Sequence, residues 1–329
     1  MTDPEQAGWT RKDLVGMQPL SRREIEMILD TAPHFVGVSN RPSGIKKVPL
    51  LQGRLVVNWF HEPSTRTRTS FELAAKRLSA DTLSISETTS SSVKGETLHD
   101  TLANIEAMHT DIIVIRHSCA GAPHMLAASH ASHIVNAGDG RHAHPTQALL
   151  DSFTIREHIR KRRGDPEATL DGVKITLIGD IEHSRVARSD IRAWKKLGAD
   201  VTLCGPATLM PVEVEQLGVR VCYDLRDAIS EADVIYTLRI QLERQSTGLF
   251  PSIREYIRLF RIDNESLKAA PPDAIIMHPG PINRDIELAT EVADNQVRSV
   301  ILEQVSNGVA IRMAVMHLLV NGGGPAAAQ

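Results

Sequence analysis

The chain has 329 residues, of which 42% are hydrophobic and 4% aromatic, and its formal net charge is −3 at pH 7. This length is enough for about two domains, and the slight negative charge with few aromatic residues argues against a nucleic-acid-binding surface. Three cysteines without metal-ligand spacing, Cys119, Cys204 and Cys222, favour reduced thiols in a cytoplasmic protein. We predict that the polar residues 1–12 are loose and contain no signal peptide. No stretch reaches the length of a membrane span.

Strands and helices are predicted to alternate along the chain. The first series has strands at residues 55–60, 82–86, 111–116 and 133–137, and helices at 21–35, 71–78, 97–109, 123–129 and 145–160. After a surface loop at 161–170, the second has strands at 173–178, 200–204, 219–222, 233–237 and 274–277, and helices at 184–197, 225–231 and 299–320. Such alternation implies parallel sheets. We therefore predict an α/β protein of two doubly wound domains, residues 1–148 plus 304–329 and residues 149–303, with the active site in a cleft between them. The tail from residue 321 is predicted to be disordered.

Polar and charged residues follow the predicted strands. Arg116 ends one strand, and residues 138–144, 179–185, 239–241 and 278–281 each follow another. Ligands bind at the carboxyl ends of the strands in doubly wound sheets. This repetition predicts an active site built from these segments.

The stretch HEPSTRTRTSFE at residues 61–72 joins a strand to a helix. The first turn of a helix offers unpaired N–H groups, and Ser64, Thr65 and Thr67 add hydroxyls while Arg66 and Arg68 add guanidinium groups. Together they suit a phosphate. The alternative is an ordinary helix cap with two solvated arginines.

The polar loop at residues 87–96 holds Ser90 and Lys94. We interpret it as a lid that carries Lys94 to an anion, and the alternative is a solvated surface loop. His144 opens a helix after a strand, where a neutral imidazole can donate a hydrogen bond to a carbonyl oxygen that gains charge. Its alternative role is that of a residue near a helix N-cap.

No cofactor and no metal site are predicted. The turn at residues 179–185 lacks the glycine pattern of a dinucleotide site, and no Walker-type loop occurs. The histidines between His109 and His144 show no zinc-protease spacing and have no cysteine at short range that could complete a zinc site.

Seven motifs occur in one order along residues 14–320. They are PSTRTR at 63–68, Ser90 with KGET at 94–97, Arg116 with His117, GDG at 138–140 with HPTQ at 144–147, Gly179 and Asp180 with Arg185, Arg239 with Gln241, and HPGP at 278–281. Each motif alone is weak, but the ordered set is specific. The chain resembles the transcarbamoylase family, in its aspartate carbamoyltransferase branch.

This resemblance implies that the chain transfers the carbamoyl group of carbamoyl phosphate to L-aspartate, an early committed step of pyrimidine biosynthesis. The first domain would bind carbamoyl phosphate and the second aspartate. The implied carbamoyl phosphate residues are Ser64, Thr65, Arg66, Thr67, Ser90, Lys94, Arg116, His144 and Gln147. Among these, Arg66, Thr67, Arg116 and His144 would be catalytic. The implied aspartate residues are Arg185, Arg239, Gln241, Gly280 and Pro281.

The resemblance also implies a cytoplasmic homotrimer, in which Ser90 and Lys94 reach the active site of a neighbouring subunit. No nucleic acid or membrane partner is expected. The stretch HPGPINR at residues 278–284 resembles a bacterial branch often associated with a dihydroorotase-like partner, which leaves such a partner, or a regulatory chain, open.

Two alternative functions remain. An ornithine carbamoyltransferase would have an acidic or polar pocket for its second substrate. Its resemblance would also imply a cysteine in the loop that corresponds to residues 278–281. This chain has no cysteine there, and Arg239 suits the β-carboxylate of aspartate. A non-catalytic scaffold of the same fold is disfavoured because every expected charged site residue is present.

Overall fold

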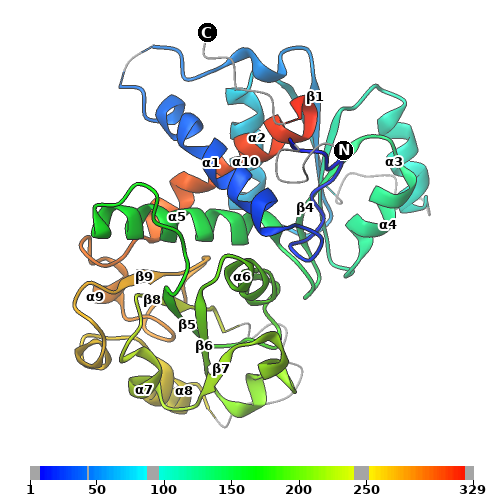
Figure 1. Cartoon of the computed structure of the whole chain (residues 1–329). Coiled ribbons are helices and arrows are strands. Elements are labelled where there is room, and N and C mark those ends of the chain that lie inside the picture. The colour runs from blue at the N-terminus through cyan, green and yellow to red at the C-terminus, as the bar shows by residue number, and fades with distance from the viewer. Residues whose placement is uncertain (1–7, 43, 87–95, 241–251, 323–329) are drawn as a thin grey trace, which may run out of the picture. The chain divides into compact units, whose positions relative to one another are not determined.

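The computed structural model describes residues 8–42, 44–86, 96–240 and 252–322 (Figure 1). The chain divides into two compact units. Unit 1 is Met1–Leu149 with Asn307–Gln329, and unit 2 is Leu150–Ser306. The boundaries lie within helices α5 (Pro145–Arg163) and α10 (Ile301–Asn321).

Unit 1 contains a four-stranded parallel sheet in the order β2-β1-β3-β4. Its strands are β1 (Leu55–Phe60), β2 (Asp81–Ser86), β3 (Ile112–His117) and β4 (His133–Asp139). The chain adds β2 on one side of β1 and then β3 and β4 on the other. The winding therefore reverses between β1 and β3, which is the point where such sheets bind ligands.

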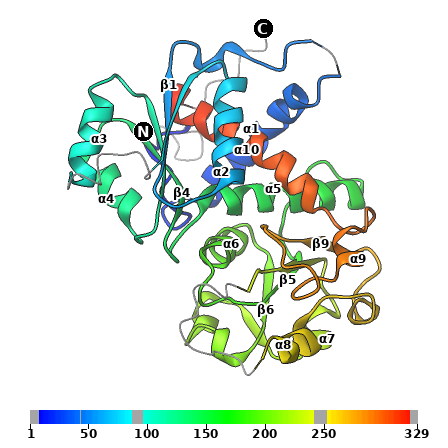
Figure 2. The ribbon, with the colours of Figure 1, turned by 180° about the vertical axis from the view of Figure 1, so that it is seen from behind.

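Helices cover both faces of this sheet. They are α1 (Arg22–Ser39), α2 (Thr65–Arg77), α3 (Leu98–Glu106), α4 (Ala122–Ser129) and the unit 1 parts of α5 and α10. Trp59 on one face packs in a cluster with Leu102 of α3 and Leu126 of α4. Figures 1 and 2 show α3 and α4 on the side of the sheet away from α2. The end of the chain returns to unit 1, since the Arg312 guanidinium lies 4.8 Å from the Phe71 ring centroid.

Unit 2 contains a five-stranded parallel sheet in the order β7-β6-β5-β8-β9. Its strands are β5 (Lys174–Ile178), β6 (Asp200–Cys204), β7 (Arg220–Cys222), β8 (Val234–Thr237) and β9 (Ile275–Met277). Here the winding reverses between β5 and β8.

Helices again lie on both faces. They are α6 (Arg185–Lys196), α7 (Leu225–Ile229), α8 (Ile253–Phe260) and α9 (Thr290–Ala293). Ile235 of β8 packs in a cluster with Ile229 of α7 and Phe260 of α8. The next residue, Tyr236, points the opposite way and its ring centroid lies 5.5 Å from that of Trp194 in α6. The prediction of two doubly wound parallel-sheet domains is confirmed.

The structure differs from the sequence prediction near the N-terminus. Trp9 is 6% exposed, and Arg11 Nε lies 2.5 Å from Glu24 Oε1. The prediction that this segment is loose is therefore wrong for residues 9–12, because an indole and an ion pair hold it against the rest of unit 1. Residues 1–7 and most of the predicted tail, 323–329, lie outside the described residues. Helices α8 and α9 were not predicted. In the part of the chain that the structure describes, no helix has the length and apolar character to cross a membrane.

Candidate active site

The junction between β1 and α2 presents the start of a helix at the switch point of unit 1. Ser64 is the N-cap, but its side chain makes no capping hydrogen bond. Its hydroxyl instead donates to Thr67 Oγ1 at 2.9 Å. Since the first N–H groups of a helix have no acceptor within it, the helix start remains suited to an anion. Thr67 is buried and Arg66 is exposed.

Arg116, in β3 beside β1, holds a positive charge at the same sheet edge. Its side chain is 10% exposed. Nη1 donates to the Ala137 carbonyl oxygen at 3.3 Å, and Nη2 donates to Glu62 Oε1 at 3.3 Å. The Arg116 carbonyl oxygen accepts from His61 N–H at 2.8 Å. The guanidinium is thus fixed between the end of β4 and the segment after β1, and its partner Glu62 was not predicted from the sequence.

The turn from β4 to α5 carries His144 and Gln147. Gly140 N–H donates to the His117 carbonyl oxygen at 3.0 Å, which aligns the ends of β3 and β4. A Cβ on Gly140 would lie 2.9 Å from the Ser118 carbonyl oxygen, and φ is +47°, so a glycine is required. His144 and Gln147 are buried at the start of α5. Both polar side chains thus follow β4, as Arg116 ends β3, on neighbouring strands of the sheet.

In unit 2, the segment after β5 positions Arg185. Gly179 has φ +126°, and a Cβ there would lie 3.0 Å from the Leu238 carbonyl oxygen. The Asp180 carboxylate accepts from His183 N–H at 3.1 Å and faces His183 Nδ1 at 2.8 Å. This turn leads into α6, whose first residue is Arg185, 6% exposed.

Arg239, which follows the neighbouring strand β8, is held by an asparagine. Arg239 Nε donates to Asn283 Oδ1 at 3.3 Å, and Asn283 Nδ2 donates to the Ile240 carbonyl oxygen at 3.2 Å. Asn283 N–H donates to Glu287 Oε1 at 2.6 Å. These contacts join the segment after β8 to the one after β9.

The loop after β9 is ordered by His278 and the same glutamate. His278 Nδ1 accepts from Gly280 N–H at 2.7 Å, so its proton is on Nε2, which donates to Glu287 Oε1 at 3.2 Å. The Gly280–Pro281 peptide is cis. Burial, and then the Glu287 carboxylate, raise the pKa of Tyr256 well above its ordinary value, so the phenol keeps its proton.

The sequence did not single out Asn283 and Glu287, whose hydrogen bonds order this part of unit 2, or the buried Tyr256. Asn283 lies in the HPGPINR stretch, which was the available signal. Three predicted site residues, Ser90, Lys94 and Gln241, lie outside the described residues.

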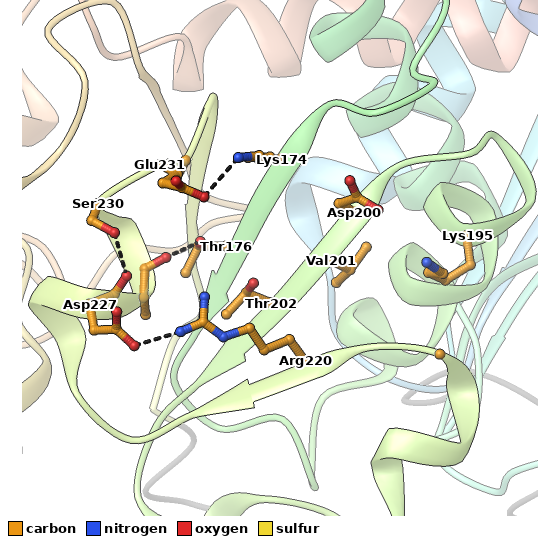
Figure 3. Close-up of a pocket in the computed structure, with 13 residues that line it drawn as sticks. Lys174, Thr176, Lys195, Asp200, Val201, Thr202, Arg220, Asp227, Ser230 and Glu231 are labelled. Atoms are coloured by element: carbon orange, nitrogen blue, oxygen red, sulfur yellow. Dashed lines mark hydrogen bonds and ion pairs between the residues drawn. The ribbon is translucent and has the colours of Figure 1, made fainter.

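A cavity of about 290 Å³ in unit 2 lies at the other edge of the sheet (Figure 3). Lys174 and Asp200, the first residues of β5 and β6, line it. Four of its charged residues form ion pairs, since Lys174 Nζ lies 2.7 Å from Glu231 and Arg220 lies 2.5 Å from Asp227. No predicted site residue lines this cavity.

Two family models match the chain. One, described as aspartate/ornithine carbamoyltransferase, carbamoyl-P binding domain, matches residues 12–157, and the other, described as the Asp/Orn binding domain of the same family, matches residues 171–319. The chain belongs to the aspartate/ornithine carbamoyltransferase family. The family resemblance inferred from the ordered motifs is confirmed.

Relatives within the carbamoyltransferase family differ in the substrate that their names state. The chain is 57% identical over 311 residues, 94% of its length and 98% of the relative, to an aspartate carbamoyltransferase catalytic subunit from Syntrophus aciditrophicus. An aspartate transcarbamoylase from Trypanosoma cruzi, solved in complex with carbamoyl aspartate and phosphate, has a TM-score of 0.82 and 30% identity over 94% of this chain and 96% of that one. An ornithine carbamoyltransferase from Pyrococcus furiosus has a TM-score of 0.81 and 30% identity over 95% and 98%. The fold alone therefore does not separate the two substrates.

Proposed function

We propose that this carbamoyltransferase converts carbamoyl phosphate and L-aspartate into N-carbamoyl-L-aspartate and phosphate. The observation that carries the proposal is the 57% identity, over nearly the whole chain, to a catalytic subunit named for aspartate. The second observation is Arg239, a cation that follows β8 and whose Nε donates to the amide oxygen of Asn283. Such a cation suits the second carboxylate of aspartate.

In unit 1, the phosphate would bind at the start of α2, where Ser64, Thr65, Arg66 and Thr67 lie. The carbonyl oxygen of the carbamoyl group would accept hydrogen bonds from Thr67, Arg116 and His144. Gln147 would bind the carbamoyl nitrogen. These four side chains are buried. Their burial supports these roles, because donors in a site of low dielectric stabilise developing charge more strongly than donors in water.

In unit 2, Arg185 and Arg239 would bind the two carboxylates of aspartate, with Gln241 supporting them. The backbone at Gly280 and Pro281 would direct the amine. The amine nitrogen then forms a bond to the carbamoyl carbon while the bond from that carbon to the phosphate oxygen breaks. The amine loses a proton and phosphate leaves with the bonding electron pair. Holding both reactants in line contributes much of the rate.

The reaction is tested by supplying carbamoyl phosphate with L-aspartate or with L-ornithine and measuring the ureido product. Product from aspartate alone is the expected result. Product from ornithine alone would make ornithine the second substrate, while the residues assigned to carbamoyl phosphate would keep their roles. Product from neither would favour a non-catalytic scaffold and refute the proposal.

Two substitutions test the roles in unit 1. Arg66→Ala and His144→Ala should each keep the fold and lower turnover by about 10²–10³-fold, the cost of one donor aimed at developing charge. Arg41→Ala, which changes another exposed arginine of unit 1, is the matched control and should keep wild-type turnover. Normal turnover in either site variant, with an unchanged circular dichroism spectrum, would contradict the assignment.

We further propose a cytoplasmic homotrimer that acts in pyrimidine biosynthesis, with Ser90 and Lys94 completing the site of a neighbouring subunit. Mixing inactive Arg66→Ala and Lys94→Ala proteins after mild dissociation tests this sharing. Each hybrid trimer would contain one site with both wild-type residues, so activity should return. If mixing restored no activity although size measurements showed hybrids, Lys94 would act within its own subunit.

A further inference from the structure

Three side chains that have no role in the proposed reaction meet beside the turn after β4. His124 comes from α4, Asp139 is the last residue of β4, and His142 lies in the turn. One potential ligand atom from each lies within 4.8 Å of the other two. Across the described ranges, no other group of three or more histidine, cysteine, aspartate or glutamate residues has this arrangement. No metal site is predicted from the sequence, because the histidine spacing matches no zinc motif.

The carboxylate of this cluster is buried and held in place. Asp139 is fully buried. Its Oδ1 accepts from Asn136 Nδ2 at 2.8 Å and from Ala143 N–H at 3.0 Å, and its Oδ2 accepts from Gly121 N–H at 2.7 Å. Such supporting contacts orient a carboxylate and increase its affinity for a metal ion, because the group loses little conformational freedom when the ion binds.

The two imidazole rings lie on the solvent side of this carboxylate. His142 Nδ1 is 2.9 Å from Asp139 Oδ2, and the His142 side chain is 39% exposed. The ring centroids of His124 and His142 are 5.1 Å apart at an interplanar angle of 65°. His124 is exposed, so an ion with its water can approach, and within the described chain Asp139 forms no ion pair with an arginine or a lysine.

A histidine binds metal through a neutral imidazole nitrogen. The simplest alternative is an aspartate–histidine hydrogen bond beside an unrelated surface histidine.

We propose that His124, Asp139 and His142 form a binding site for a divalent first-row transition metal ion, with Zn²⁺ as the preferred ion. Two imidazole nitrogens and one carboxylate oxygen suit Zn²⁺, Co²⁺ and Ni²⁺ better than Mg²⁺ or Ca²⁺. Bond lengths of about 2.0–2.2 Å place tetrahedral ligand atoms about 3.3–3.6 Å apart. The ligand atoms now lie within 4.8 Å of one another, and rotation of the exposed His124 ring can bring its nitrogen closer to the other two. Water would fill the remaining coordination position. A bound ion would tie α4 to the turn after β4.

The test uses the full chain without an affinity tag, freed of metal by chelator and titrated with Co²⁺. Wild type should show stoichiometric visible absorption bands of a low-coordinate Co²⁺ ion, and Zn²⁺ should displace them. His124→Ala and His142→Ala should each weaken Co²⁺ binding at least about tenfold, because each removes one ligand. His34→Ala, which removes an exposed histidine of α1, is the matched control and should bind as wild type. Asp139 is left unchanged because its hydrogen bonds hold the turn.

Thermal unfolding provides a second readout. An ion that binds only the native state raises its stability, so Zn²⁺ should raise the melting temperature of wild type and of His34→Ala but not of His124→Ala. Two results would overturn the proposal. One is the absence of a stoichiometric Co²⁺ signal in wild type, and the other is equal binding by wild type and His124→Ala.

Discussion

Asn283 is predicted to set the affinity for aspartate by holding Arg239. The Asn283→Ala variant loses the bond from Arg239 Nε at 3.3 Å and the bond to the Ile240 carbonyl oxygen at 3.2 Å, but keeps its backbone bond to Glu287. A hydrogen bond to a charged group contributes about 1.5–3 kcal/mol and a neutral one about 0.5–1.5 kcal/mol. Both distances are long, so we take the lower values, about 2 kcal/mol together, or about 30-fold in kcat/KM for aspartate.

Initial rates with varied aspartate at saturating carbamoyl phosphate measure this effect, and the reverse titration provides an internal comparison. The KM for aspartate should rise, while the KM for carbamoyl phosphate should stay unchanged because its proposed residues lie in unit 1. Asn264→Ala is the matched control, since its amide donates to Glu291 on the surface. An unchanged KM for aspartate in Asn283→Ala would refute the reasoning, and an equal rise in both KM values would indicate a general structural defect.

Two further predictions concern buried groups in unit 2. Burial, and then Asp151, raise the pKa of Asp190 well above its ordinary value, so the folded chain keeps a proton that the unfolded chain releases above about pH 4, and stability falls as pH rises from there toward the raised pKa. Asp190→Asn removes this loss and should unfold at higher urea concentration than wild type at pH 8, with a smaller difference at pH 4; parallel pH profiles would contradict this. Burial also raises the pKa of Cys204 to about 12, whereas Cys119 is exposed. A thiol reagent should therefore label the native protein rapidly at Cys119, and Cys119→Ser should abolish the rapid phase; rapid labelling of Cys204 would refute the burial argument.

Local patterns predicted most of the regular elements. Apolar runs such as residues 112–115 are strands in the structure, and the capping box at Ser21 and Glu24 begins α1. Helix α8 was missed although Ser252 caps it by accepting from Glu255 N–H and Tyr256 and Phe260 share one face. The four-residue helix α9 has no comparable signal. Short elements depend on their surroundings more than on their own sequence.

Residues that follow strands were recognisable as site candidates because polar side chains interrupt an apolar pattern there. Ser64, Arg116 and His144 were found in this way, and the structure places each at the carboxyl edge of the unit 1 sheet. Glu62 and Asn283 were not, because a partner side chain is identified by contact rather than by spacing. Arg239 and Asn283, for example, are 44 positions apart.

The sequence by itself determined the family, the alternation of strands and helices, and the types of side chain available for an anionic substrate pair. These properties are local or depend only on the order of short motifs. The tertiary structure alone decided the strand orders, and hence where each winding reversal falls. It also decided which buried groups share a partner, and it brought His124 to Asp139 and His142. Such contacts arise from the packing of segments distant in sequence, whose side-chain spacing carries no periodic signal.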